Sequence, residues 1–334
     1  MGICISTASN EIHVNDFGNE NVVYYQDNNN NEAKYLQVGS FFSQQGNKGP
    51  NQDSAILYQR YGAENGVFAG VFDGHGKNGE IVSKLVMNKL PSLFLKNILS
   101  LPKISPVDNE AVKTNNFNKW KEACFSSFKL MDKDIKSLQK LDCSCSGTTA
   151  VVAIRQNDDL IIANLGDSRA VLGRKTEEGV IEDVQLTTDL KPSLPSEAER
   201  IRKCDGRVLA LKEEPHIQRV WLPHEDAPGL AMSRAFGDFM LKKYGIISKP
   251  DVSYHHISPN DQFLVLATDG VWDVLSNDQV VSIVCATNNA AAASKAVVDA
   301  SLSAWNQKFP NSKRDDSTAL CLFLQQHASL QNST

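Results

Sequence analysis

The sequence predicts an α+β fold in which antiparallel sheets are flanked by helices. Strand-like and helix-like segments do not alternate one for one, which argues against a doubly wound parallel sheet. Two strand-like runs, 148–154 and 160–164, are joined by the polar sequence Gln-Asn-Asp-Asp at 156–159, which is typical of a hairpin turn. From 117 to 138, apolar residues recur at spacings of three and four, which indicates a long amphipathic helix.

The first half of the chain is expected to begin with strands. An edge-like segment beginning at Phe41-Phe42 leads to Asn51-Gln52-Asp53, and the run 67–72 predicts a buried strand. Residues 81–94 have helical apolar spacing, although Pro91 should kink that helix. The stripe of the long helix that follows is interpreted as core; it consists of Phe117, Trp120, Cys124, Phe128, Met131, Ile135 and Leu138.

The second half is expected to be dominated by strands. After the hairpin, 169–173 continues as a strand, and Ser196-Glu197-Ala198-Glu199 resembles a capping box that opens a helix through Lys203. Prolines and charges in 208–229 predict an irregular excursion. The remaining expected elements are a buried strand at 262–268, a helix at 290–305 and a last strand at 318–324.

Length and composition exclude several classes of protein. The 334 residues, 41% of them apolar, suffice for a large folded core. A formal charge of -5 without a long basic run argues against nucleic acid as the main partner. No apolar run approaches the length of a membrane-spanning helix. The seven cysteines form neither a disulfide framework nor a zinc-site pattern, so we expect reduced thiols.

The start of the chain fits a lipidation pattern. Residues 1–34 are polar and include four consecutive asparagines, so we expect a flexible arm before a folded domain at 35–325 and a short tail at 326–334. The start Met-Gly-Ile-Cys-Ile-Ser fits myristoylation of Gly2, and a palmitoyl chain on Cys4 would supply a second anchor; a chance match is the alternative. We expect an intracellular, cytoplasmic protein that reaches the cytoplasmic face of the plasma membrane if acylated, and a nuclear pool is compatible with the sequence.

The segment Asp73-Gly74-His75 follows an apolar strand and carries three kinds of chemistry. A carboxylate at a strand end can bridge hard cations, the glycine lets its own carbonyl approach as a further ligand, and the imidazole can move a proton near neutral pH. Taken alone, the segment fits a polar turn about as well as a functional site.

Further aspartates share the same sequence logic. Three of the carboxylates abut strongly apolar strands, and strand ends in one sheet can converge on one rim. Carboxylates crowded there would repel one another unless cations neutralised them, and all-oxygen ligation favours Mg²⁺ or Mn²⁺. The chemistry implied is metal-assisted hydrolysis of a phosphate ester. The additional aspartates are Asp53, Asp167, Asp269, Asp273 and the pair Asp315-Asp316.

Seven short motifs in one order carry a family resemblance over about residues 36–324. They are Asn-Gln-Asp (51–53), Val-Phe-Asp-Gly-His-Gly (71–76), Ser-Gly-Thr-Thr-Ala (146–150), Gly-Asp-Ser-Arg (166–169), Met-Ser-Arg-Ala-Phe-Gly-Asp (232–238), Ala-Thr-Asp-Gly-Val-Trp-Asp-Val-Leu (267–275) and Arg-Asp-Asp-Ser-Thr (314–318). The set resembles the type 2C metal-dependent serine/threonine protein phosphatases. The long insert before Gly229 and the Met-Gly-x-Cys start resemble a plant subgroup.

The resemblance implies a central β-sandwich of two antiparallel sheets with helices on both outer faces, and a monomeric enzyme that acts on phosphorylated proteins. It implies two Mg²⁺ or Mn²⁺ ions and a weaker third. A hydroxide held by the metals would attack phosphorus in line without a phosphoenzyme, and His75 would protonate the leaving oxygen. The implied metal-site residues are Asp73 as the bridge, the Gly74 carbonyl, Asp269, Asp315, Asp53 through water, and Asp167 with Asp273 for the third ion.

Two positions depart from the family pattern. Gln52 stands where many members have Glu, and Lys48 stands at the position of the phosphate-binding Arg. A lysine can pair with phosphate as a point charge, less directionally than an arginine, so slower turnover or weaker phosphate affinity is compatible with this change. Arg169 and Arg234 are interpreted as members of structural ion pairs, and Asp238 as structural.

Two matters stay open at this level. Trp221 is either a core residue of the excursion or an exposed docking anchor. The chain is expected to be a phosphatase; the alternative is a catalytically weak, membrane-tethered scaffold on the same fold, against which the intact aspartates at 73, 269 and 315 argue. A small-molecule phosphate hydrolase would need a deep closed pocket.

Overall fold

The computed structural model describes residues 22–25, 38–100, 109–287 and 289–325. The lipidation candidates Gly2 and Cys4 and the predicted tail at 326–334 lie outside these residues. Within them, no helix is long and apolar enough to cross a membrane.

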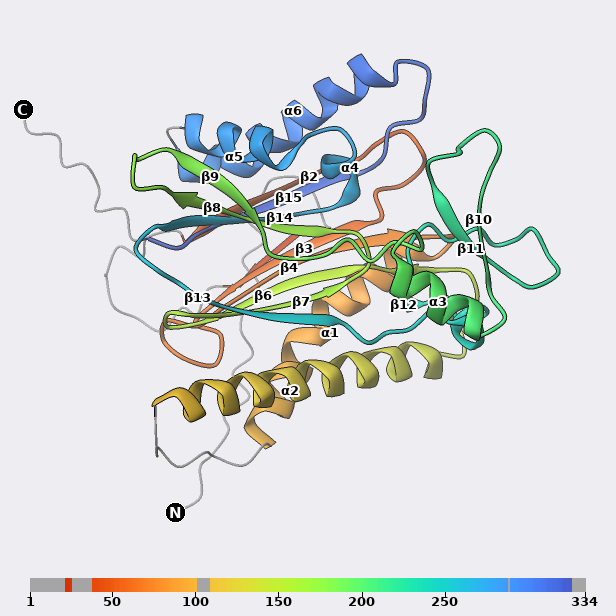
Figure 1. The fold of residues 1–334 in the computed structure, drawn as a ribbon, viewed down its shortest axis with the longest axis horizontal. Coiled ribbons are helices and arrows are strands. Elements are labelled where there is room, and N and C mark those ends of the chain that lie inside the picture. The colour runs from red at the N-terminus through yellow and green to blue at the C-terminus, as the bar shows by residue number, and fades with distance from the viewer. Residues whose placement is uncertain (1–21, 26–37, 101–108, 288, 326–334) are drawn as a thin grey trace, which may run out of the picture.

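Two sheets stack face to face (Figure 1). Neighbouring strands are antiparallel, apart from the parallel pair β1–β3. The first sheet runs β1 (Val22–Tyr25), β3 (Asp53–Gln59), β4 (Val67–His75), β6 (Ala150–Gln156), β7 (Asp159–Leu165) and β13 (Asp251–His256); β5 (Gly147–Thr148) also pairs with β4, and β12 (Phe236–Gly237) pairs with β5. The second runs β2 (Gly39–Gln44), β15 (Ser317–Phe323), β14 (Asp261–Ala267), β8 (Arg169–Lys175) and β9 (Ile181–Gln185).

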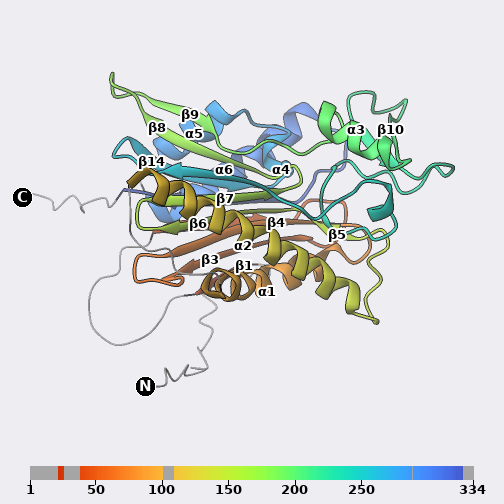
Figure 2. The same cartoon turned by 60° about the horizontal axis from the view of Figure 1, so that its bottom comes forward.

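Helices cover both outer faces of this sandwich (Figures 1 and 2). On the first sheet lie α1 (Gly79–Ser100) and α2 (Asn109–Ser137). On the second lie α4 (Asp269–Trp272), α5 (Asn277–Ala286), the 3-10 turn η2 (Ala290–Ala292) and α6 (Ala293–Lys308). Three apolar layers follow, one under each pair of helices and one between the sheets. The expected helix–sheet–sheet–helix architecture is confirmed.

A small fourth cluster of apolar side chains lies at one end of the sandwich, around α3 (Pro195–Lys203), β10 (Arg207–Ala210), β11 (Gln218–Trp221) and η1 (Lys242–Tyr244). The excursion predicted for 208–229 therefore contains most of a two-stranded hairpin and is less irregular than expected. Trp221 is a core residue, 8% exposed, and its Nε1 donates to the Leu209 carbonyl 3.0 Å away. The docking-anchor interpretation of Trp221 was wrong.

Most predicted elements are confirmed, including the hairpin of β6 and β7 and the long helix α2. The helix α1 continues past Pro91 to Ser100. Four residues of the predicted flexible arm, Val22–Tyr25, form β1, so that prediction does not hold for them. The capping box was also wrong, because α3 begins at Pro195 after Leu194 without a side-chain cap. A proline at the first helical position already has the required φ and needs no donor there.

Candidate metal centre and active site

Carboxylates from both sheets meet at one rim of the sandwich. Asp53 begins β3 and is the register partner of Asp73 near the end of β4. Asp269 comes two residues after β14, and Asp315 two residues before its neighbour β15. A hydrogen bond of 2.9 Å from the Thr268 hydroxyl to Asp53 Oδ2 joins the two sheets at this point. The predicted convergence of these strand ends is what the register produces.

Without bound cations, the carboxylates at this rim repel one another and are costly to ionise. Removal from water, and then the charges of Asp269 and Asp53, raise the pKa of Asp73 well above its ordinary value. Burial, followed by the charges of Asp273 and Asp167, does the same to the pKa of Asp269. The pKa of Asp53 rises to about 8 because of burial and then the charge of Asp316. Bound cations would relieve this repulsion.

The donors present fit a hard divalent cation. Carboxylate and carbonyl oxygens are the ligands that Mg²⁺ and Mn²⁺ prefer. Asp167 is 3% exposed, and its Oδ1 has no hydrogen-bond partner among the described residues. A Cβ on Gly74 would lie 2.5 Å from the carbonyl oxygens of both Gln52 and Gly79, so only glycine allows the backbone to pass here. In the described part of the chain, no three acidic, His or Cys side chains already stand close enough to hold an ion.

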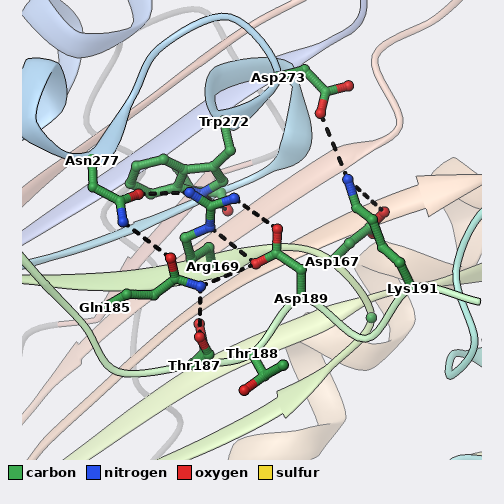
Figure 3. Close-up of polar contacts among 12 residues, drawn as sticks. Asp167, Arg169, Gln185, Thr187, Thr188, Asp189, Lys191, Trp272, Asp273 and Asn277 are labelled. Carbon is green, nitrogen blue, oxygen red and sulfur yellow. Dashed lines mark hydrogen bonds and ion pairs between the residues drawn. The ribbon is translucent and has the colours of Figure 1, made fainter. Parts of the chain in front are cut away.

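Two lysines place ammonium groups among these carboxylates. Lys48 forms an ion pair with Asp315. Lys191 lies between two others, with Nζ 3.9 Å from Asp167 Oδ2 and 3.8 Å from Asp273 Oδ1 (Figure 3). Asp167 and Asp273, which come from different parts of the chain, are thereby brought around one positive charge.

His75 stands beside the carboxylates with a partner of its own. Its Nε2 lies 2.7 Å from Asp238 Oδ2, while its buried Nδ1 has no hydrogen-bond partner among the described residues. Burial lowers the pKa of His75, but the charge and hydrogen bond of Asp238 outweigh burial and leave the pKa raised. Asp238 was interpreted as structural from the sequence and therefore missed as a partner of His75; the only available signal was its place at the end of the 232–238 motif.

The two arginines noted in the sequence are structural, as expected. Arg169 makes a two-pronged pair with Asp189, at 3.0 and 2.7 Å, and its guanidinium packs over the Trp272 ring (Figure 3). Arg234 pairs with Glu197 rather than with the neighbouring Asp238. Neither guanidinium is left for a ligand.

Asp316 and Gln52 organise the backbone of the rim. The backbone N–H groups of Gly46 and Gln52 donate to Asp316 at 2.7 and 2.8 Å, which fixes the turn between β2 and β3 beside Lys48. The Gln52 amide donates to the Gly76 carbonyl at 2.7 Å and so ties this turn to the end of β4.

Comparison with known proteins identifies the family of this chain. The family model described as Protein phosphatase 2C matches residues 38–308. "Probable protein phosphatase 2C 72" of Arabidopsis thaliana is 53% identical over 97% of this chain and 98% of its own. "Probable protein phosphatase 2C 12" of Oryza sativa subsp. japonica is 47% identical over 98% of this chain and 92% of its own. The crystal structure of serine-threonine phosphatase 2C from Toxoplasma gondii superposes with a TM-score of 0.74 at 27% identity, covering 85% of this chain and 94% of that one.

Proposed function

Because this chain belongs to the protein phosphatase 2C family, we propose that its carboxylate rim is the active site of a metal-dependent protein-serine/threonine phosphatase. The observation that carries the proposal is the meeting of Asp53, Asp73, Asp269 and Asp315 from four strand ends and two sheets beside His75.

The position of each residue at the rim suggests its role. Asp73, the Gly74 carbonyl, Asp269 and Asp315 would hold two Mg²⁺ or Mn²⁺ ions, with Asp53 acting through water. Bound there, such ions lower the pKa of water and clamp a phosphoryl group. Asp167 and Asp273 would hold a weaker third ion in competition with the ammonium of Lys191. Lys48, half exposed at the edge of the rim, would pair with the phosphoryl oxygens.

His75 is the group suited to protonate the leaving serine or threonine oxygen. Asp238 Oδ2 lies against Nε2 of His75, and the raised pKa keeps the imidazole charged, and so able to donate a proton, to higher pH. We expect His75→Ala to lower the rate by about 10²–10⁴-fold for a phosphothreonyl peptide, and by less for an aryl phosphate with a good leaving group. An equal loss for both substrates would contradict the role of His75 as acid.

The decisive experiment is hydrolysis of a phosphothreonyl peptide by the full chain with Mn²⁺, with EDTA, and by Asp73→Asn. Activity should require Mn²⁺ and disappear in the variant. Asp251→Asn, on an exposed position of β13, is the matched control and should keep wild-type activity. Turnover in EDTA would exclude the metal mechanism, and the absence of turnover at every Mn²⁺ concentration would favour a scaffold on this fold.

The start of the chain supports a second proposal, attachment to the cytoplasmic face of a membrane. It rests on the pattern at Gly2 and Cys4 alone. Gly2→Ala should move the protein from the membrane to the soluble fraction of cells, and Cys4→Ser should weaken the attachment. If fractionation does not change in Gly2→Ala, the anchor is rejected.

A further inference from the structure

A cavity of about 400 Å³ opens between α2 and the segment after η1, outside the carboxylate rim. Its lining combines an apolar floor with lysines and has no acidic side chain. The lining residues are Phe125, Lys129, Lys242, Ile246, Ile247, Ser248 and Lys249. An apolar pocket bordered by ammonium groups is suited to an apolar side chain with anionic neighbours.

Two lysines of α2 stand on either side of Phe125 in the sequence, and one of them, Lys129, lines the pocket. Lys121, Phe125 and Lys129 are four residues apart on α2 and so lie along one side of it. Two ammonium groups lie near the Phe125 ring, with Lys249 Nζ 4.6 Å and Lys121 Nζ 5.9 Å from its centroid. Among the described residues, no carboxylate forms an ion pair with Lys121, Lys129 or Lys249. In a chain whose formal charge is -5, this is a concentration of unneutralised positive charge.

The fourth lysine connects the pocket to the catalytic side of the molecule. Lys242 donates to Asp132 at 3.0 Å and to the Ala235 carbonyl at 2.8 Å. Asp132 also accepts from the Gly237 backbone N–H at 3.0 Å, and the next residue is Asp238, the partner of His75. The wall of the pocket and the support of His75 thus belong to one hydrogen-bonded unit. A peptide held in the pocket would therefore lie close to the rim.

We propose that this pocket is a docking site for an acidic segment of the substrate protein, in which an apolar side chain enters between Phe125 and Ile247 and flanking carboxylates pair with Lys129 and Lys249. The inference rests on the proposed function only in taking the peptide to be part of a phosphoprotein. Charge complementarity selects this occupant, since an uncharged apolar peptide would leave the lysines unused and a basic one would be repelled.

The test measures binding without catalysis. The probe is a fluorescein-labelled, non-phosphorylated peptide that has two leucines between blocks of three glutamates. Its binding to the full chain is measured by fluorescence anisotropy. Lys129→Glu/Lys249→Glu should weaken binding about tenfold or more, because each like-charge contact opposes docking. A peptide with glutamine in place of glutamate should also bind weakly, and binding should fall as salt rises.

The matched control is Lys89→Glu/Lys96→Glu, which makes the same change of charge at exposed positions of the neighbouring α1. It should bind the peptide like the wild type. The lysine pairs are exposed, so folding should survive; Lys129→Gln/Lys249→Gln provides a milder variant with the same expected direction. The proposal is overturned if the wild type does not bind the probe, if both charge reversals weaken it equally, or if the glutamine peptide binds as tightly. None of these results depends on phosphatase activity.

Discussion

Two groups of carboxylates in this molecule are buried or half-buried, and the chain gives them opposite surroundings. Glu197 is 2% exposed, and it accepts hydrogen bonds from Arg200, Arg234 and Ser233 at 2.6–3.0 Å. These bonds outweigh burial and lower its pKa to about 2. At the rim, Asp73 and Asp269 have mainly one another and further aspartates as neighbours, and their pKa values rise.

The difference separates a structural charge from a site. A charge that is fully paired by the chain has no oxygen left for a ligand and serves to join α3 to the segment at 233–234. A group of charges that the chain leaves unpaired costs stability and persists where a ligand supplies the missing positive charge. The following predictions test this contrast in order of the expected effect.

Asp269→Asn should give the largest loss of activity. Removing a metal-binding charge should lower Mn²⁺-dependent turnover of a phosphothreonyl peptide by about 10³-fold or more. In EDTA, the melting temperature of the variant should not fall, because the substitution removes repulsion. Retention of a tenth of the wild-type activity, or a large loss of thermal stability in EDTA, would contradict the contrast.

Glu197→Gln should have the opposite profile. Leaving Arg200 and Arg234 without their carboxylate should lower the free energy of unfolding by about 3–5 kcal/mol. Urea denaturation measures this, and turnover per folded molecule should stay within severalfold of the wild type. The control is Glu199→Gln, two residues away but exposed, where loss of the solvent-screened ion pair with Lys203 should cost far less. Equal losses in both variants would show that pairing of Glu197 matters little.

The meeting of the rim aspartates could be predicted from the sequence, whereas the pairing of Glu197 with its arginines could not, and the reason is physical. Strand ends are visible in the sequence, so aspartates next to apolar runs, such as Asp73 and Asp269, could be predicted to meet. Glu197 instead fitted the local pattern of a capping box. Its partner Arg234 lies 37 positions further along the chain, and no local sequence pattern predicts a contact over that separation.

The same limit applies to partners within the site. His75 was predicted to be catalytic from its place after Asp73, but its contact with Asp238 spans 163 positions. The ion pair of Lys48 with Asp315 spans 267. These contacts depend on how the two sheets and their connections pack, and a single sequence records the residue types without their pairing.

The pH dependence of stability should distinguish the two groups in metal-free protein. The pKa of Asp53 is about 8 when folded and about 3.9 when unfolded, so its contribution is fully present below pH ~4 and is lost as pH rises through about 8. The pKa of Glu197 is lowered to about 2, so its contribution is lost only as pH falls toward that value. In EDTA, the melting temperature should therefore fall between pH 5 and 8.

Two comparisons test whether the rim carboxylates cause this fall of the melting temperature with pH. Asp53→Asn should flatten the profile in EDTA, and saturating Mn²⁺ should flatten it for the wild type, since bound cations stabilise the charged carboxylates. A melting temperature that is constant or rises between pH 5 and 8 in EDTA would mean that repulsion among the rim carboxylates does not destabilise the folded protein.

The smallest expected effect concerns Lys191, which is intermediate between the two groups. Its ammonium lies nearly 4 Å from Asp167 and Asp273, whereas the arginines bond Glu197 directly, so these two carboxylates are neutralised without being saturated. We expect Lys191→Met to tighten the weakest Mn²⁺ site about three- to tenfold, because a competing cation is removed from partly exposed surroundings. Calorimetric titration with Mn²⁺ measures this, and Lys203→Met, at an exposed ion pair, should leave the affinity unchanged. Unchanged or weaker binding in Lys191→Met would mean that the lysine supports the carboxylates instead of competing for them, and Asp167 with Asp273 would then belong with Glu197 as a structural group.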